Sequence, residues 1–347
     1  MFQKHLLSIF IFCVFSSSIF GANHDTISSK YDTNYIISYR DWFHVTLVGI
    51  NQQSGISLIK AIDEKDLKFS TNNPYSFGVG IDYEWLTFEY SKSIKNIESS
   101  SKKKGNTKST SLRLGYTGRK IRIDSYYTKS RGYYLKNIDD FIPDGYVDTT
   151  EYPRFDDLSN KTFALSFYYT FNYKKYSNMA ALWQIDRQIK SAGSPVIGLL
   201  TLWEGLSSNQ PFHFSDTLDI DEDFLKIKSA DYKRIGIFGG YMHTFSIIKK
   251  FYLHGAITQG LFYSYGTINN YDGEQINKNT LGVSFNYRIS VGYNSKRLYA
   301  GVLFVKDTFI GDAFASKTVF SSHDYLRILV GYRFYIKKRN WMKKVYM

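Results

Sequence analysis

Apolar and polar residues alternate along much of this chain with a period of two, rather than with the period of about 3.6 residues that marks a helix. The clearest run covers residues 281–292, and the same alternation appears at 76–83, 111–116, 163–172 and 325–334. One face of each run is apolar or aromatic, and the other carries Gly, Ser, Asn or charged side chains. Because successive side chains of a strand point to opposite faces, the pattern predicts an all-β chain whose strands separate two different environments.

Such alternation is compatible with a soluble β-sandwich and with a membrane barrel, since the strands of both have one apolar face. Three features favour the barrel. Several runs are about ten residues or longer, as a tilted membrane-spanning strand requires. Tyr and Phe crowd the strand ends, as in aromatic girdles, and small residues lie beside charges on the polar face, as in a crowded lumen. We therefore predict a transmembrane antiparallel up-and-down β-barrel.

Short and long connections alternate between the predicted strands, as periplasmic turns and extracellular loops do in such barrels. The predicted short turns are 84–85, 117–118, 172–177, 243–250 and 294–296. The predicted long loops are 92–107, 137–160, 205–230, 266–279 and 306–323. Counting the passages predicts about 14 strands, with about 12 as the alternative, because bacterial barrels usually have even strand numbers.

This alternation depends on how residues 179–203 are interpreted. We take them as one passage in which Ser191-Ala192-Gly193-Ser194 forms a bulge or kink. A hairpin at the same place is the alternative, and it would invert the sidedness of every later connection.

The N-terminus has the organisation of a secretory signal peptide. Lys4 and His5 precede an apolar run at 6–20, and Gly21-Ala22 follows it. We expect cleavage near Ala22. A membrane anchor helix is the alternative, although the run is shorter than the roughly 20 residues that a helical span needs. The predicted segments are the signal peptide at 1–22, a periplasmic lead-in at 23–40, the barrel at 41–336 and a basic tail at 337–347.

The composition sharpens this interpretation. The 347 residues include 30 Tyr, 27 Phe and 5 Trp but only 1 Cys. A disordered chain lacks so many residues to bury, and a single Cys excludes a disulfide framework or a Cys-based metal site. The formal net charge of +13 is divided among strand arginines, a Lys-rich stretch at 99–108 and the tail. Because the signal peptide directs the protein away from nucleic acid, we expect no nucleic-acid partner.

Several motifs along the chain occur together in a known family. They are Asn73-Pro74-Tyr75-Ser76-Phe77-Gly78-Val79-Gly80, Tyr83-Glu84-Trp85, Arg131-Gly132-Tyr133-Tyr134-Leu135, Lys190-Ser191-Ala192-Gly193-Ser194 and Gly331-Tyr332-Arg333-Phe334. In this the chain resembles the domain of unknown function 4421 family of Bacteroidota, over residues 40–336. The resemblance implies an outer-membrane-type barrel with no established activity and no assigned catalytic residues. One departure is that Phe334 precedes the basic tail, whereas such barrels often end at the aromatic residue that the insertion machinery recognises.

Ionisable residues on the polar faces of the predicted strands are candidates to line the lumen. They are Arg113, Arg122, Arg234, Arg288, Arg327, Arg333, Asp82, Glu84, Glu89 and Asp124. Two interpretations remain open. The residues form either a charged lumen that binds or selects an anionic solute, or an internal ion-pair network that fills and rigidifies a closed barrel. Arginines outnumber carboxylates in this set, which leaves room for an anion.

An acidic stretch at 139–157 contains a partial calcium-loop pattern around Gly145. The candidate ligands are Asp140, Asp144, Asp148 and Glu151. Ile142 occupies a ligand position and no predicted helices flank the loop, so a Pro-Asp-Gly turn in a solvated loop is the alternative. We expect no resident cofactor, with calcium as the one candidate.

These features predict an exported outer-membrane protein that contacts membrane lipid, lipopolysaccharide and the barrel-insertion machinery. Three functions remain open: a structural or small-solute transport barrel with a charged lumen, a surface interaction or adhesion barrel acting through its long acidic loops, and a lipid-modifying barrel enzyme. No HExxH, Walker A or GxSxG motif is present, and no Ser-His-Asp set can be assembled. Only His254 lies clearly in the middle of a strand on a polar face. We therefore expect no enzymatic activity.

Overall fold

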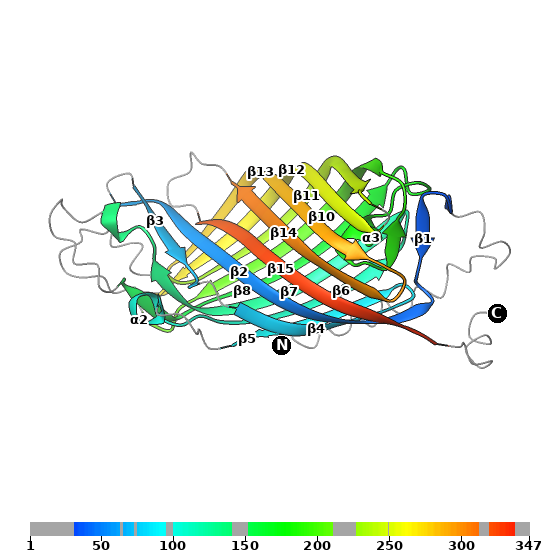
Figure 1. The fold of residues 1–347 in the computed structure, drawn as a ribbon. Coiled ribbons are helices and arrows are strands. Elements are labelled where there is room, and N and C mark those ends of the chain that lie inside the picture. The colour runs from blue at the N-terminus through cyan, green and yellow to red at the C-terminus, as the bar shows by residue number, and fades with distance from the viewer. Residues whose placement is uncertain are drawn as a thin grey trace, which may run out of the picture.

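The computed structural model describes residues 31–62, 65–72, 75–94, 100–140, 152–210, 227–248, 250–311 and 319–336. In these ranges, twelve tilted antiparallel strands form the wall of a barrel (Figure 1). They are β2 (Trp42–Ile62), β4 (Tyr75–Tyr83), β5 (Leu86–Ser93), β6 (Lys108–Thr117), β7 (Ile121–Leu135), β8 (Arg154–Thr170), β10 (Ala192–Ser207), β11 (Ile227–Ser246), β12 (Phe251–Asn270), β13 (Gln275–Asn294), β14 (Leu298–Ile310) and β15 (Val319–Tyr335).

The barrel closes because its last strand pairs with its first. β15 runs antiparallel to β2 from the pair Val319 and Leu58 to the pair Tyr335 and Trp42. Around the rest of the wall, each strand pairs with the wall strands before and after it in the chain, which is the up-and-down order. A short additional strand, β3 (Lys65–Ser70), pairs with the end of β2 and contacts β7.

The predicted transmembrane up-and-down barrel is confirmed with 12 wall strands in the described part of the chain, so the preferred count of 14 is wrong and the alternative is correct. The sequence pattern does not show clearly where strands begin and end between residues 42 and 72. In the structure, this part of the chain contains the single 21-residue strand β2 and the short strand β3. β2 is one continuous strand because its pairing with β15, which closes the barrel, extends as far as Leu58.

The outward faces of the strands form an apolar band. Ile237, Leu261 and Leu281 are 62%, 63% and 73% exposed, whereas Phe238 and Phe262 point inward and are buried. A water-soluble protein rarely exposes a continuous apolar surface of this extent, whereas a membrane-spanning wall requires one. No helix in the described ranges combines the length and apolarity needed to cross a membrane.

Inward-facing glycines accommodate aromatic rings that lie against the wall. A Cβ atom at Gly331 would overlap the ring of Tyr299 on the next strand, and a Cβ atom at Gly198 would overlap the ring of Phe238. At these two positions the glycine makes room for an aromatic side chain that partly fills the lumen.

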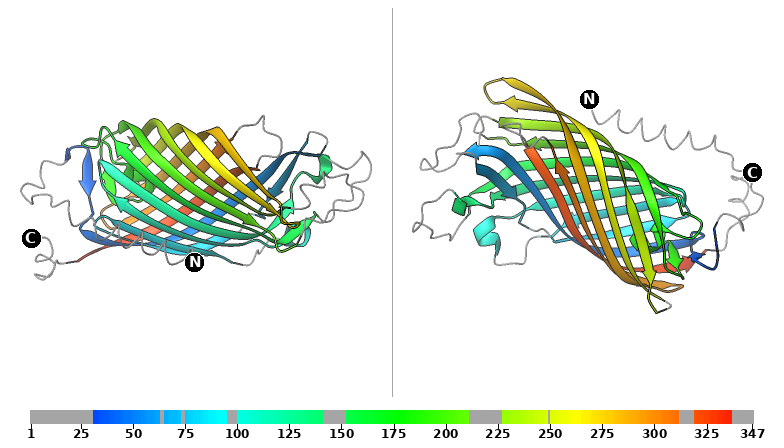
Figure 2. Two further views of the ribbon diagram at one scale, coloured as in Figure 1. Left: turned by 180° about the vertical axis from the view of Figure 1, so that it is seen from behind. Right: turned by 90° about the horizontal axis from the view of Figure 1, so that it is seen from above.

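The two ends of the barrel are built differently (Figures 1 and 2). We call the end with the short hairpins between β4 and β5, β6 and β7, β11 and β12, and β13 and β14 the turn end. β3, α2 (Ser100–Lys104) and η3 (Ile138–Asp140) lie at the opposite end, the loop end. Here β12 and β13 stay paired up to Asn269 and Gln275, so the long loop predicted at 266–279 is wrong.

A folded insertion at residues 171–191 connects β8 to β10 and lies in the turn end. It contains α3 (Asn178–Leu182), whose five residues are all buried, and β9 (Asp186–Gln188). β9 pairs with β1 (Ile36–Ser38), which precedes the barrel. We call residues 171–191 together with β1 the plug.

The plug corrects the interpretation of residues 179–203. They are not one strand passage, because only the residues from Ala192 onward enter the wall. Ser191-Ala192-Gly193-Ser194 is neither a kink nor a hairpin but the place where the chain leaves the plug and enters β10. Of the predicted lead-in, residues 31–40 lie at the turn end, where β1 joins the plug. The predicted signal peptide and the basic tail lie outside the described residues.

Candidate lumen site

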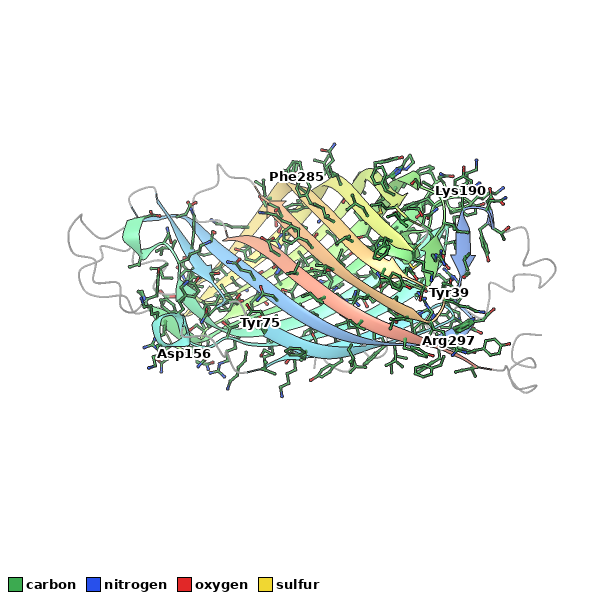
Figure 3. The ribbon with its side chains drawn as sticks, in the orientation of Figure 1. Tyr39, Tyr75, Asp156, Lys190, Phe285 and Arg297 are labelled. Atoms are coloured by element: carbon green, nitrogen blue, oxygen red, sulfur yellow. The ribbon has the colours of Figure 1, made fainter. Side chains whose placement is uncertain are left out.

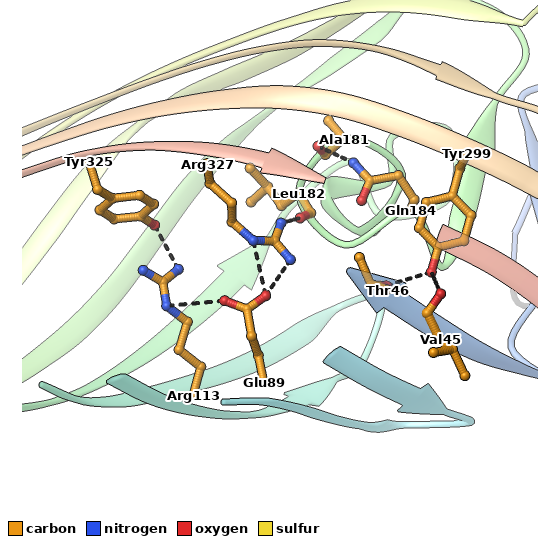
Figure 4. A network of polar contacts seen from close by, with 10 residues as sticks. All are labelled: Val45, Thr46, Glu89, Arg113, Ala181, Leu182, Gln184, Tyr299, Tyr325 and Arg327. Carbon is orange, nitrogen blue, oxygen red and sulfur yellow. Dashed lines mark hydrogen bonds and ion pairs between the residues drawn. The ribbon is translucent and has the colours of Figure 1, made fainter. Parts of the chain in front are cut away.

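Arg327, Glu89 and Arg113 form an ion-pair network inside the barrel (Figure 4). Arg327 Nη2 and Nε lie 2.5 and 3.0 Å from Glu89 Oε2. Arg113 Nε lies 3.8 Å from Glu89 Oε1, and Arg113 donates a 2.9 Å hydrogen bond to the hydroxyl of Tyr325. Glu89 is only 2% exposed, and a carboxylate so deeply buried requires the compensation that two guanidinium groups provide.

Donors on the wall hold the backbone carbonyl oxygens of the plug. The bonds run from Arg327 to Leu182, from Arg333 to Gln184, from Asn294 to Ala180 and Asp186, and from Ser290 and Tyr252 to Ala181. A five-residue helix such as α3 cannot satisfy its own last carbonyl groups. Side chains of the barrel wall do this instead, so hydrogen bonds to backbone carbonyl groups help to hold this part of the plug.

Arg333 takes part in this arrangement without a carboxylate partner in the described part of the chain. Its guanidinium carbon lies 4.3 Å from the ring centre of Tyr39 and 4.5 Å from that of Tyr299. Besides Gln184, it donates to the Ser295 carbonyl and to the side-chain oxygen of Asn294. Aromatic faces and carbonyl dipoles therefore stabilise this buried charge.

Asp186 anchors the base of the plug. The hydroxyls of Ser38 and Ser177 each donate a 2.7 Å hydrogen bond to it, and Arg119 Nη2 and Arg40 Nε lie 3.4 and 4.0 Å from its Oδ1. Burial alone would raise the pKa of Asp186, but the two guanidinium groups and the two hydroxyls outweigh burial and lower it below its usual value. Asp186 is therefore ionised at neutral pH and joins β1, the insertion and the β6–β7 turn.

A third buried carboxylate lies on β10. Glu204 forms an ion pair with Arg234 on the neighbouring β11. Its other oxygen lies 2.8 Å from Nε2 of His323 on β15. Glu204 thus joins strands on distant parts of the wall.

Arg122 and Arg288 approach the ring of Tyr168, at 4.0 and 5.6 Å from its centre. Arg122 Nε lies 2.9 Å from an oxygen of Asp124, and no other ion pair of Arg122 is present among the described residues. Arg288 donates a 2.9 Å hydrogen bond to the Tyr168 hydroxyl and has no carboxylate within ion-pair distance in the described part of the chain. Since a guanidinium has five N–H donors, most of those of Arg288 remain available.

These groups surround a cavity of about 80 Å³ in the lumen, which we call the chamber. Its charged lining residues are Arg113, Arg288, Arg327, Asp124, Asp307 and His323. Leu182 and Trp183 of the plug also line it. A cavity of this size holds several water molecules or one small polar solute.

Nine of the ten predicted lumen residues point into the barrel: the six arginines, Asp82, Glu89 and Asp124. Whether they select a solute stays a prediction. The tenth, Glu84, does not lie on a strand. It lies in the turn between β4 and β5 with a φ of 53°, and its N–H donates to the Arg40 carbonyl. The alternation of faces ends at Tyr83, where the strand ends, so Glu84 does not follow it.

The sequence patterns miss several ionisable groups of the interior, among them Asp186, Glu204, Asp307 and His323. Asp307 and His323 fall within the long loop predicted at 306–323, although each belongs to a wall strand. Glu204 lies on the same inner face of β10 as Leu202 and Leu206, but the predicted passage ended one residue before it, at 203. Asp186 gives no local signal, because most of its partners come from segments far away in the chain.

The predicted calcium loop falls mostly outside the described residues. Asp140 ends η3 and accepts a 2.8 Å hydrogen bond from the side chain of Asn137. Asp144, Asp148 and Glu151 are not described. The calcium site therefore stays a prediction.

The profile of the family described as "Domain of unknown function (DUF4421)" matches residues 30–334. The chain belongs to this family. The resemblance carried by the short motifs is thereby confirmed over nearly the whole barrel. No curated protein matches the chain.

Several solved structures are similar to the barrel. The outer membrane protease OmpT from Escherichia coli shares 8% identity at a TM-score of 0.38, with 86% of this chain and 98% of that chain covered. An outer membrane channel from Pseudomonas putida F1 shares 10% identity at a TM-score of 0.35, with 87% of this chain and 99% of that chain covered. The toluene transporter TodX from Pseudomonas putida shares 10% identity at a TM-score of 0.28, with 85% of this chain and 90% of that chain covered. Likeness at this level assigns no activity to this chain.

Proposed function

We propose that this family member is an outer-membrane barrel that passes small polar solutes, and that the plug closes its lumen at the periplasmic side. Export through the predicted signal peptide and the apolar outer band support this location. The long connections would then face outward, as they do in barrels of this class.

One observation carries the proposal: Leu182 and Trp183 of the plug line the same charged chamber as Arg288. A displacement of the plug would therefore open the chamber toward the turn end. The plug is held to the wall in part by hydrogen bonds to carbonyl groups, and water can replace such bonds when a segment moves. The available donors of Arg288 favour solutes that carry an acceptor or a negative charge.

Planar-bilayer conductance of the refolded protein tests this function. We expect infrequent openings of the natural chain and a higher open probability for Arg333→Ala, which removes the bond to Gln184. In a Cys13→Ser background, Leu182→Cys with Leu303→Cys joins two residues that pack together in one buried cluster. Oxidation of this pair should suppress the openings, and reduction should restore them.

Arg297→Ala is the matched control, because Arg297 lies in the β13–β14 turn and donates to the exposed Tyr332 hydroxyl. It should leave the open probability unchanged. Absence of openings in both the natural chain and Arg333→Ala, with the folded barrel verified by heat-modifiable gel migration, would contradict a solute-passing function and favour a purely structural barrel.

Surface interaction through the long loops and lipid modification stay alternative predictions. His254, the enzyme candidate, is buried on β12 and its Nδ1 lies 3.0 Å from the Thr244 hydroxyl. We keep the expectation that the chain is not an enzyme. Lipid turnover that is lost on His254→Ala, with barrel folding retained, would overturn it.

A further inference from the structure

Gln259 places a polar side chain in the middle of the apolar outer band. It is exposed on the outward face of β12, between Ile257 and Leu261, which are 59% and 63% exposed. Among the described residues, none hydrogen-bonds to its amide. In the hydrocarbon region of a bilayer no water is available, so an amide without a partner is costly.

The wall around Gln259 is hollowed on its outer side. A groove of about 950 Å³ crosses β8, β10, β11, β12 and β13, and Gln259, Gly239 and Phe285 are among its lining residues. Figure 2 (right) looks onto this wall, and Phe285 is labelled at its edge in Figure 3. Gly239 and Phe285 are the cross-strand neighbours of Gln259 on its two sides.

Gly239 is not required by packing within the chain. A Cβ atom there would approach other atoms only to 3.6 Å, which is ordinary contact, whereas a Cβ atom at the inward Gly198 would overlap the Phe238 ring. The glycine therefore lowers the outer surface beside Gln259. Small residues at a membrane-embedded surface let another backbone approach closely.

We propose that this groove is the interface between two copies of the chain within the membrane, with the two Gln259 amides facing each other. An amide carries both donors and an acceptor, so two of them can exchange a pair of hydrogen bonds. A two-fold axis perpendicular to the membrane places the same residue of both copies at the same depth. Lipid acyl chains could fill the groove, but they offer no polar group at this depth.

Disulfide formation in lipid vesicles tests the proposal. In a Cys13→Ser background, Gln259→Cys should form a cross-linked dimer on mild oxidation at low protein-to-lipid ratio. Phe88→Cys is the matched control. Phe88 is also outward and exposed, but it lies on β5, six strands away around the twelve-stranded wall. The control should form few cross-links, because it lies on the opposite side of the barrel.

Two further variants test separately how much the Gln259 amide and the shape of the groove contribute to dimer formation. Gln259→Leu removes the amide and should raise the dimer dissociation constant by roughly threefold to thirtyfold, the range measured for polar contacts within membranes. Gly239→Leu fills the groove and should abolish the dimer. Both variants should retain the heat-modifiable migration of the folded barrel.

Several results would overturn the proposal. They are cross-linking of Gln259→Cys no stronger than that of Phe88→Cys, an unchanged dissociation constant in Gln259→Leu, or a natural chain that stays monomeric at every ratio tested. A monomer that retains lipid bound against Gln259 would identify lipid as the occupant instead. None of these results depends on whether the lumen conducts.

Discussion

The two ends of the lumen are closed by different kinds of contact. Toward the loop end, buried apolar side chains form a continuous cluster that includes Leu67, Phe69, Leu135, Phe155, Leu158 and Ile227. At the turn end, hydrogen bonds to the carbonyl groups of the plug and the ion pairs of Asp186 add a large polar part to the apolar packing of residues such as Leu182. Opening an apolar cluster exposes its side chains to water, which forms no favourable contacts to replace the lost burial. Hydrogen bonds and ion pairs that break can be replaced by bonds to water. Under the proposed function, we therefore expect the turn end to be the end that opens.

The largest expected effect concerns the network beside the plug. Arg327→Ala leaves the buried Glu89 with only the more distant Arg113, and we expect the free energy of unfolding to fall by about 3–5 kcal/mol. Urea unfolding in detergent micelles measures it. The double variant Glu89→Gln with Arg327→Met should lose less, because the buried carboxylate is removed together with Arg327 and Arg113 keeps its hydrogen bond to Tyr325. Equal losses in both variants would show that packing, not charge, dominates this contact.

The apolar closure is tested by Leu158→Ala, which truncates a side chain that is 1% exposed. We expect a loss of about 3 kcal/mol from the lost burial and the cavity that remains. The same variant should leave channel openings unchanged, whereas Arg333→Ala should increase them. Openings that increase in Leu158→Ala would mean that the loop end also acts as a gate, and the contrast between the ends would disappear.

The polar closure should depend on pH through Asp186. Its pKa is lower in the folded protein than the usual value, so ionised Asp186 stabilises the docked plug at neutral pH. That contribution begins to fall below about pH 4, the usual carboxyl pKa, and is lost as the pH falls through the lower pKa of the folded protein. Hydrogen exchange of residues 178–188 should therefore accelerate in acid beyond the intrinsic change in exchange rate. Asp186→Asn should already exchange faster at pH 7 and lose this dependence, and protection equal to that of the natural chain would exclude the role of Asp186.

The smallest effect is expected where the wall donors are redundant. Ser290 and Tyr252 both donate to the Ala181 carbonyl, at 3.2 and 3.3 Å. Ser290→Ala should lower the free energy of unfolding by about 1 kcal/mol or less, because Tyr252 and the Gln184 amide, 2.9 Å from the same oxygen, keep the carbonyl bonded. Adding Tyr252→Phe and Gln184→Met should cost more than the sum of the single variants, because the carbonyl then loses all three donors. Strict additivity would show that the three donors do not share this carbonyl.

Much of the wall is predictable from local pattern, but its connections are less so. Alternation places Arg113, Arg288 and Arg327 on the inner face because the period of a strand fixes which side each residue faces. The same rule fails at Glu84, where the strand has ended. Asp307 and His323 were hidden in a predicted loop because polar residues near a strand end carry no apolar signal, although pairing with neighbouring strands extends the wall through them.

The sequence by itself determined the class of the protein, its apolar outer face, its charged inner face and its family, because all of these follow from local periodicity and motifs. Only the tertiary structure decided that the wall has 12 strands, that residues 171–191 fold into the lumen and that the arginines bind the plug as well as each other. The physical reason is that closure, register and ion-pair choice join residues far apart in the chain, such as Glu89 with Arg327. No local pattern encodes such partners.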